Sequence, residues 1–119
     1  MPFIASDPEN YKDQVVGDGQ CVAFVQEASG APHTSQWKEG EKVRGASIAN
    51  GTAIATFIDG VYPSHPHGNH AAIYVGQNAD GLVVWDQWTG QPVHQRTIHF
   101  RGGVGDPSND GDAFSVIET

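Results

Sequence analysis

The sequence predicts an α+β domain in which N-terminal helices pack on an antiparallel sheet of about five strands. Helix signals are confined to the first third of the chain, and the residues from Ala53 onward form short runs rich in branched and aromatic side chains. Helices followed by consecutive strands are typical of α+β domains. Because 119 residues are enough for one core, we predict that residues 1–119 form a single domain.

Two helices are expected in the first third. Ser6 precedes Asp7, Pro8 and Glu9, so a capping hydroxyl is followed by a proline in the first turn and an acid at the third position. A second helix is predicted from Gln20 to Ala28, where apolar residues recur at spacings of three and four and Gly30 follows. The charged segment Lys38–Lys42 is expected to be a solvated surface stretch.

Strands are predicted in five segments, which are Ala53–Ile58, His70–Gly76, Leu82–Gln87, Val93–Phe100 and Ala113–Ile117. Clusters of Gly, Pro, Asn and Asp separate them. The turn Asn78–Gly81 predicts that the second and third strands form an antiparallel hairpin.

Composition excludes several classes of function. The 14 acidic and 6 basic residues give a net charge of −8, which disfavours binding to nucleic acid or to an anionic membrane. The longest apolar runs have five residues, too few for a membrane span. A single cysteine excludes an intrachain disulfide and a multi-cysteine zinc site, and no cofactor is expected. The first ten residues lack a basic segment followed by an apolar core, so we expect synthesis in the cytoplasm without a signal peptide.

Cys21 is a candidate nucleophile because it lies in the first turn of its predicted helix. Unpaired backbone N–H groups and the positive end of the helix dipole favour a thiolate there. The N–H of Cys21 is also available to an oxyanion. The alternative is a buried core cysteine.

His70 and Asp86 are candidates for the base and for the residue that orients it. His70 begins a predicted strand, and Asp86 lies sixteen residues later in the partner strand of the hairpin. The sum of the two numbers is even, so an even register about Asn78 places both side chains on one face. An odd register would separate them and favour Gln87. The flanking tryptophans, Trp85 and Trp88, either exclude water from this site or belong to the core.

A metal site is the competing interpretation of the same region. His65, His67 and His70 place three imidazoles within six residues. The segment lacks an adjacent carboxylate and a helical or hairpin spacing, so we predict that no metal is bound.

The ordered set Cys21, His70 and Asp86 resembles the papain-like amidohydrolases of the CHAP and NlpC-type superfamily. The resemblance also rests on the segments Gly19–Val25 (nucleophile helix), Trp37 with Gly40 (tryptophan-bearing loop), Gly51–Phe57 (first core strand) and Gly68–Gly76 (histidine strand). The sequence departs from the pattern at Thr52, where an aspartate is common, and at Asn69, which is inserted between the glycine and the histidine.

This resemblance implies a papain-like cysteine amidase fold and hydrolysis of amide bonds in peptidoglycan peptides through a thioester. Cys21 would be the nucleophile, His70 the general base and Asp86 the orienting residue. The remaining candidates for the oxyanion site and the cleft are Gln20, Trp37, Gln87 and Trp88.

A small stand-alone catalytic domain also resembles the amidase effectors that bacteria deliver into rivals through type VI or similar secretion systems. Such a protein would act in the periplasm of the target cell, and its producer would need an inhibitor (immunity) protein. Two alternatives stay open. One is a papain-like hydrolase or acyltransferase that acts on a non-wall amide, and the other is an inactive binding module of the same fold.

Overall fold

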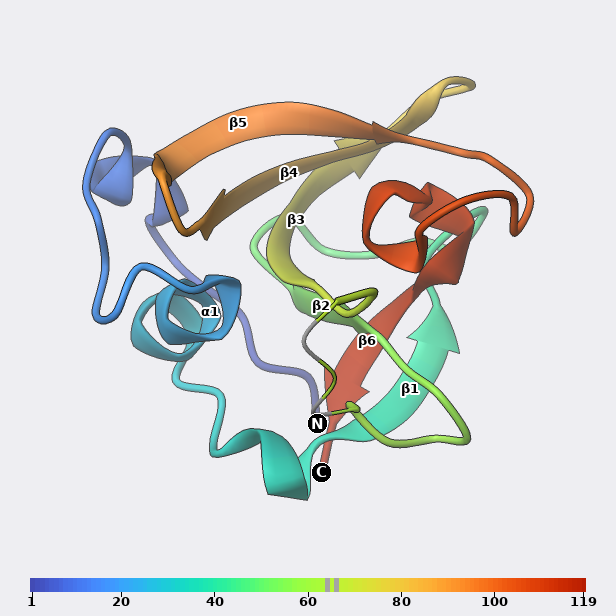
Figure 1. The fold of residues 1–119 in the computed structure, drawn as a ribbon, viewed down its shortest axis with the longest axis horizontal. Coiled ribbons are helices and arrows are strands. Elements are labelled where there is room, and N and C mark those ends of the chain that lie inside the picture. The colour runs from blue at the N-terminus through green and yellow to red at the C-terminus, as the bar shows by residue number, and fades with distance from the viewer. Residues whose placement is uncertain (64, 66) are drawn as a thin grey trace.

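The computed structural model describes residues 1–63, 65 and 67–119, and it confirms the α+β class (Figure 1). Within these residues, one α-helix packs on a six-stranded antiparallel sheet with the strand order β1-β6-β2-β3-β4-β5. The strands are β1 (Lys38–Lys42), β2 (Ala53–Thr56), β3 (Ala71–Gln77), β4 (Gly81–Trp88), β5 (Gln91–His99) and β6 (Phe114–Glu118).

The five predicted strands all form, each close to its predicted bounds. The sixth strand, β1, is the segment that the sequence predicted as a solvated surface stretch; it is exposed as predicted, but the sequence did not predict that it forms a strand. This strand pairs with β6 at the edge of the sheet, and most of its side chains are exposed. Since it buries no continuous face, its sequence carries no apolar alternation, and its charges discourage pairing with a further strand.

The two predicted helices differ in outcome. The first is one turn of 3₁₀-helix, Pro8–Tyr11, whose N-cap is Asp7 rather than Ser6 and whose cap makes no side-chain hydrogen bond. The second is α1, Cys21–Ser29, which begins after Gln20 and ends at Gly30 in the left-handed conformation. In the part of the chain that the structure describes, no helix is both long and apolar enough to cross a membrane.

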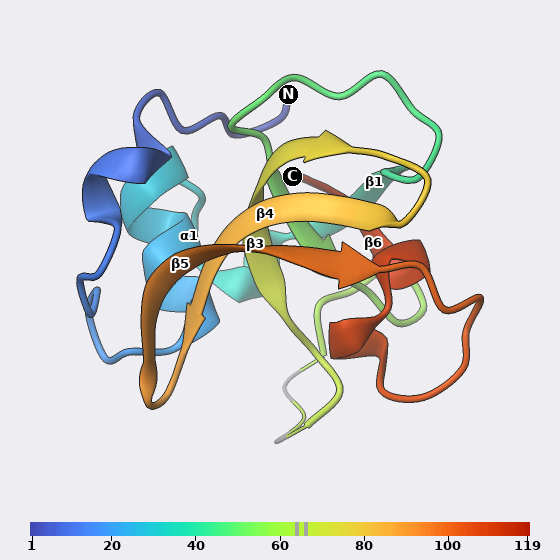
Figure 2. The same cartoon turned by 90° about the horizontal axis from the view of Figure 1, so that it is seen from above.

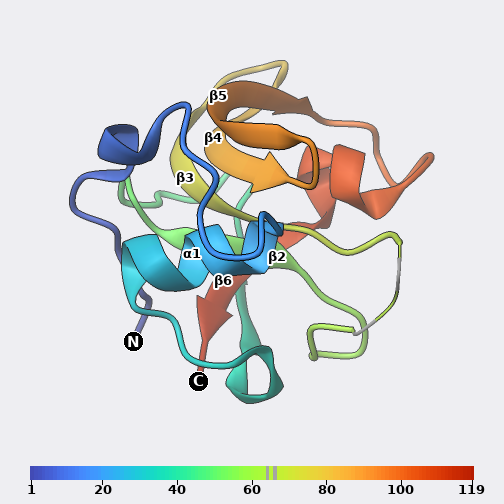
Figure 3. The same ribbon diagram turned by 60° about the vertical axis from the view of Figure 1, so that its left-hand side comes forward.

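The sheet has a hydrophobic cluster on each face. On one face, Phe24 and Val25 of α1 are fully buried against β3 and β4, and Ala71 and Ile73 of β3 join them (Figure 3). The alternate residues of β3, Ala72 and Tyr74, belong to the cluster on the other face. The C-terminal segment that joins β5 to β6 lies on the side of the sheet away from α1, as Figure 2 shows. Neighbouring residues of one strand therefore serve different faces of the sheet.

The hairpin of β3 and β4 contains a β-bulge that changes its register. Near the turn, Gln77 is opposite Leu82, whereas beyond the bulge Tyr74 is opposite Val84. Val75 is the extra residue between these two registers, because Gly76 pairs with Val83. The sum of the paired residue numbers is odd near the turn and even beyond the bulge. His70 and Asp86 lie beyond the bulge, so they share a face and are diagonal neighbours.

Two glycines of this hairpin offer a matched test of packing. A Cβ at Gly81 would clash with the Ile98 carbonyl and lie 2.8 Å from the His99 Cα, whereas a Cβ at Gly76 would meet nothing within 4 Å. We expect Gly81→Ala to lower the free energy of unfolding by about 2 kcal/mol, since both obstacles are backbone atoms. We expect Gly76→Ala to change it by less than about 1 kcal/mol. Urea unfolding of both variants measures the difference, and equal values would contradict the close approach of β4 and β5.

Candidate active site

The Cys21 thiol lies at the start of α1, where the first N–H groups of the helix have no partner within the helix. The Tyr62 hydroxyl is 3.9 Å from the Cys21 Sγ. Burial by itself would raise the pKa of the thiol. Hydrogen bonding with His70, the charge of His70, the Ala71 N–H and the Tyr62 hydroxyl outweigh burial, so the pKa of Cys21 lies below its ordinary value.

His70 is fixed immediately before β3 by its own backbone and side chain. Its N–H donates to the Thr56 Oγ1 at 3.0 Å, and its carbonyl accepts from the Thr56 N–H at 3.0 Å. The ring is buried, and its Nε2 lies 2.7 Å from the Asp86 Oδ2. Since Nε2 is held by Asp86, Nδ1 is the ring nitrogen left for the thiol.

Asp86 is fully buried in β4 and is surrounded by basic side chains. Besides His70, the Arg96 Nε donates to Oδ2 at 2.8 Å. The His94 Nε2 lies 3.0 Å from Oδ1, but the angle between them does not suit a hydrogen bond. Neither of these two atoms has a hydrogen-bond partner within the described residues. A buried carboxylate is costly unless it is paired, and here His70, immediately before β3, and Arg96 of β5 compensate it.

The pKa values of His70 and Asp86 move in opposite directions. Burial would lower the pKa of His70, but hydrogen bonds with Asp86 and Cys21 and the charges of both raise it to about 9. Burial would raise the pKa of Asp86, but the hydrogen bond and charge of His70, followed by those of Arg96, lower it. At neutral pH the imidazole is therefore protonated between two acidic groups, which favours the thiolate form of Cys21.

The structure thus brings Cys21, His70 and Asp86 together, and it also places Trp88 at the site. The Trp88 ring lies edge-on to His70, with the centroids 6.3 Å apart, and it is partly exposed. Arg96 stacks over this tryptophan, with its Cζ 5.0 Å from the ring centroid.

Gln87 does not occupy the cleft position that the sequence predicted, whereas the role of Gln20 stays a prediction. Gln87 points to the α1 face because it alternates with Asp86 along β4, and it is fully buried. Its Oε1 accepts from the Val16 N–H at 2.9 Å, and its Nε2 donates to the carbonyls of Val16 and Gln20, each at 2.8 Å. Gln87 therefore anchors the segment that leads into the Cys21 helix, whereas the exposed Gln20 takes part through its backbone.

Trp37 was predicted as a cleft residue, and the structure places it in the core instead. Its Nε1 donates to the Pro32 carbonyl at 2.8 Å, and its ring packs edge-on against Tyr62 at 4.9 Å. Trp37 therefore acts as a support for Tyr62, which is the side chain that contacts the thiol.

Sequence reasoning missed Tyr62, His94 and Arg96. Tyr62 lies in the connection between β2 and β3, and its hydroxyl accepts from the Asn69 Nδ2 at 3.3 Å. Asn69 is one of the two residues that depart from the family pattern, so the insertion was a usable signal for a local contact. His94 and Arg96 alternate along β5 with the period of a strand, and pairing of His94 with Asp86 brings both to the face of His70.

The competing metal interpretation gains no support. Among the residues that the structure describes, no group of three His, Cys, Asp or Glu side chains could hold a metal ion. His65 and His67 are exposed, and Pro66 between them lies outside the described residues.

Comparisons with known proteins point to one group of enzymes. The family described as "Domesticated amidase effector 2" (Dae2) matches residues 2–117. A type VI secretion amidase effector 2 protein from Salmonella typhi is 32% identical and covers 99% of this chain and 100% of its own length. A domesticated amidase effector 2 from Ixodes scapularis is 38% identical and covers 95% of this chain and 82% of its own. A solved structure of type 6 secretion amidase effector 2 (Tae2) superposes with a TM-score of 0.86 at 33% identity, covering 98% of this chain and 94% of that one.

The charge of Asp86 should control the titration of His70. We expect Asp86→Asn to lower the pKa of His70 from about 9 to near or below the ordinary value of about 6.5, because the amide removes the charge while burial remains. NMR titration of the His70 ring measures this change. Asp80→Asn, an identical substitution in the exposed β3–β4 turn, should leave the titration unchanged. A wild-type His70 that titrates near 6.5 would contradict the arrangement.

Proposed function

Since the chain belongs to the Dae2 family of amidase effectors, which are hydrolases, we propose that it cleaves an amide bond in peptidoglycan peptides. The observation that carries the proposal is the placement of the Cys21 thiol at the start of α1, beside an imidazole that Asp86 holds. This arrangement is that of a nucleophilic cysteine activated by a base.

In the proposed mechanism the Cys21 thiolate attacks the carbonyl carbon of the scissile amide, and the carbonyl π electrons move to the oxygen. The Cys21 N–H and the Tyr62 hydroxyl are donors available to that oxyanion. Tyr62 keeps its proton because its pKa is raised, mainly by burial. His70 gives its proton to the nitrogen as the C–N bond breaks, which releases the amine and leaves a thioester.

The second half of the reaction uses the same base. His70, now neutral, removes a proton from water, and the oxygen adds to the thioester carbonyl. The C–S bond breaks, the acid product leaves, and the thiolate and imidazolium are restored. Asp86 holds Nε2 throughout, so that one ring nitrogen carries every proton transfer.

Replacing the nucleophile tests the catalytic assignment. We expect Cys21→Ala to reduce release of fragments from purified sacculi at least about a thousandfold, because the covalent step is lost. Mass spectrometry of the soluble products follows the reaction and identifies the bond that is cut. Ala28→Ser, a substitution of similar size on the same helix, serves as the control and should retain turnover.

Two results would contradict this proposal in different ways. Undiminished turnover by Cys21→Ala would show that the nucleophile is misassigned. No release by the folded wild type would exclude wall peptides, and it would favour hydrolysis of a non-wall amide or an inactive binding module. The rate of alkylation by iodoacetamide separates those two, because an inactive module predicts a rate no faster than that of a free thiol.

We further propose that the protein acts on the wall from the periplasm of a target cell, after delivery by a secretion system, and that its producer carries an immunity protein. The Salmonella typhi relative supports this setting, because its name assigns it to type VI secretion. We expect expression with a periplasmic signal sequence to lyse a Gram-negative host, and cytoplasmic expression of the same chain to leave growth unchanged. Lysis in both compartments, or survival in both with active protein present, would contradict this setting; the Cys21→Ala variant is the control.

A further inference from the structure

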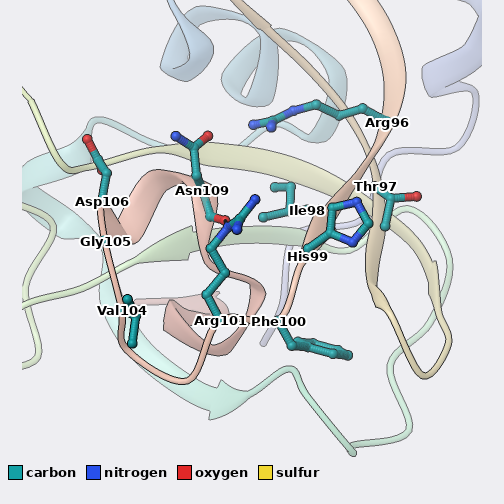
Figure 4. A pocket seen from close by; sticks show the side chains of 10 residues that line it. All are labelled: Arg96, Thr97, Ile98, His99, Phe100, Arg101, Val104, Gly105, Asp106 and Asn109. Atoms are coloured by element: carbon teal, nitrogen blue, oxygen red, sulfur yellow. Dashed lines mark hydrogen bonds between the residues drawn. The ribbon is translucent and has the colours of Figure 1, made fainter.

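Two cavities adjoin each other on the side of the sheet away from α1. The smaller, about 230 Å³, is lined by His70 and Trp88, whereas Cys21 is not among its lining residues. The larger, about 770 Å³, lies between β5 and the C-terminal segment that follows it (Figure 4). Both are lined by Arg96, Asp106 and Asn109, so the larger cavity extends the space beside His70. A volume of this size accommodates a small peptide fragment.

The larger cavity concentrates positive charge in an acidic protein. The net charge of the chain is −8, yet two of its three arginines, Arg96 and Arg101, line this cavity (Figure 4). The Arg96 Nε donates to Asp86, and the Arg101 Nε donates to the Asn109 carbonyl at 3.0 Å. Among the described residues, the Nη atoms of both arginines have no hydrogen-bond partner. Each guanidinium is therefore positioned through Nε, and its remaining N–H groups are available to bind an anion.

The position of His70 decides which half of a substrate this space receives. In an amide hydrolysis by a cysteine, the imidazole must reach the leaving nitrogen, whereas the acyl carbon stays on the sulfur. The part of the substrate that continues from the leaving nitrogen is therefore on the side of His70. The smaller cavity, which His70 lines, lies on that side, and the larger cavity continues from it.

We infer that the larger cavity binds a free carboxylate carried by the amine-releasing half of the substrate, with Arg101 and Arg96 as its donors. The inference rests on the proposed amidase function and adds a specificity that the proposed reaction does not require. Asp106 stands at the junction of the cavities, where its Oδ1 accepts from the Ser108 N–H and hydroxyl. Repulsion from Asp106 directs the carboxylate to the arginine side of the larger cavity.

Peptide substrates that differ by one carboxylate test this inference. Defined wall peptides are prepared with the carboxylate on the amine-releasing half either free or converted to a carboxamide, and a second pair carries the same change on the acyl half. We expect kcat/KM to fall about tenfold or more for the first carboxamide, because it loses charge-assisted hydrogen bonds, and to change less than about threefold for the second.

Substitution of Arg101 assigns the effect to this cavity. We expect Arg101→Gln to remove most of the preference for the free carboxylate, mainly by raising KM for the free-carboxylate peptide. Arg101→Lys, which keeps the charge, should retain part of the preference. Lys12→Gln makes the same change of charge at an exposed residue that does not line this cavity and should leave the preference intact. Thermal unfolding confirms that each variant is folded.

The outcomes separate this inference from the proposed function. Equal hydrolysis of the free carboxylate and the carboxamide would overturn the carboxylate site and leave the amidase function standing. A preference that survives in Arg101→Gln would place the recognition elsewhere and would overturn the assignment as well. No hydrolysis of any wall peptide would refute the proposed function itself, and the inference would fall with it.

Discussion

The hydrogen bond between the His70 Nε2 and the Asp86 Oδ2 is the interaction on which the site depends. Both groups are buried, so water offers neither of them an alternative partner, and their charges stabilise each other strongly. The bond fixes the orientation of the ring and leaves Nδ1 for the thiol. It also explains why β5 contributes the Arg96 guanidinium to the same carboxylate, since a desolvated anion needs more than a single cation nearby.

This interaction exists because of the bulge at Val75. The turn at Asn78–Gly81 is readable from the sequence, and the register it sets is odd, which by itself would place His70 and Asp86 on opposite faces. The extra residue restores the even register that the sequence analysis required for their pairing. A bulge of this kind depends on how both faces of the sheet pack, and no local sequence pattern in β3 predicts it.

Elements that bury one face were predictable from the sequence, and elements whose role depends on register were not. The α1 helix was placed within one residue from the spacing of its apolar side chains, and the strands β2 to β6 from their branched and aromatic residues. The edge strand Lys38–Lys42 was missed because it buries almost nothing. Arg96 and Tyr62 were missed for a related reason. Each acts on a residue distant in sequence, and only the pairing of β4 with β5 and the path of the β2–β3 connection bring them there.

Adjacent residues of β4 hold the two reacting partners from opposite faces of the sheet. Asp86 secures the imidazole, and Gln87 secures the backbone that enters the Cys21 helix through three hydrogen bonds. The positions of the sulfur and the ring thus both depend on one short segment of β4. When thermal motion shifts that strand, both partners move with it. The distance between the sulfur and the ring therefore changes less than it would if separate elements held the two groups.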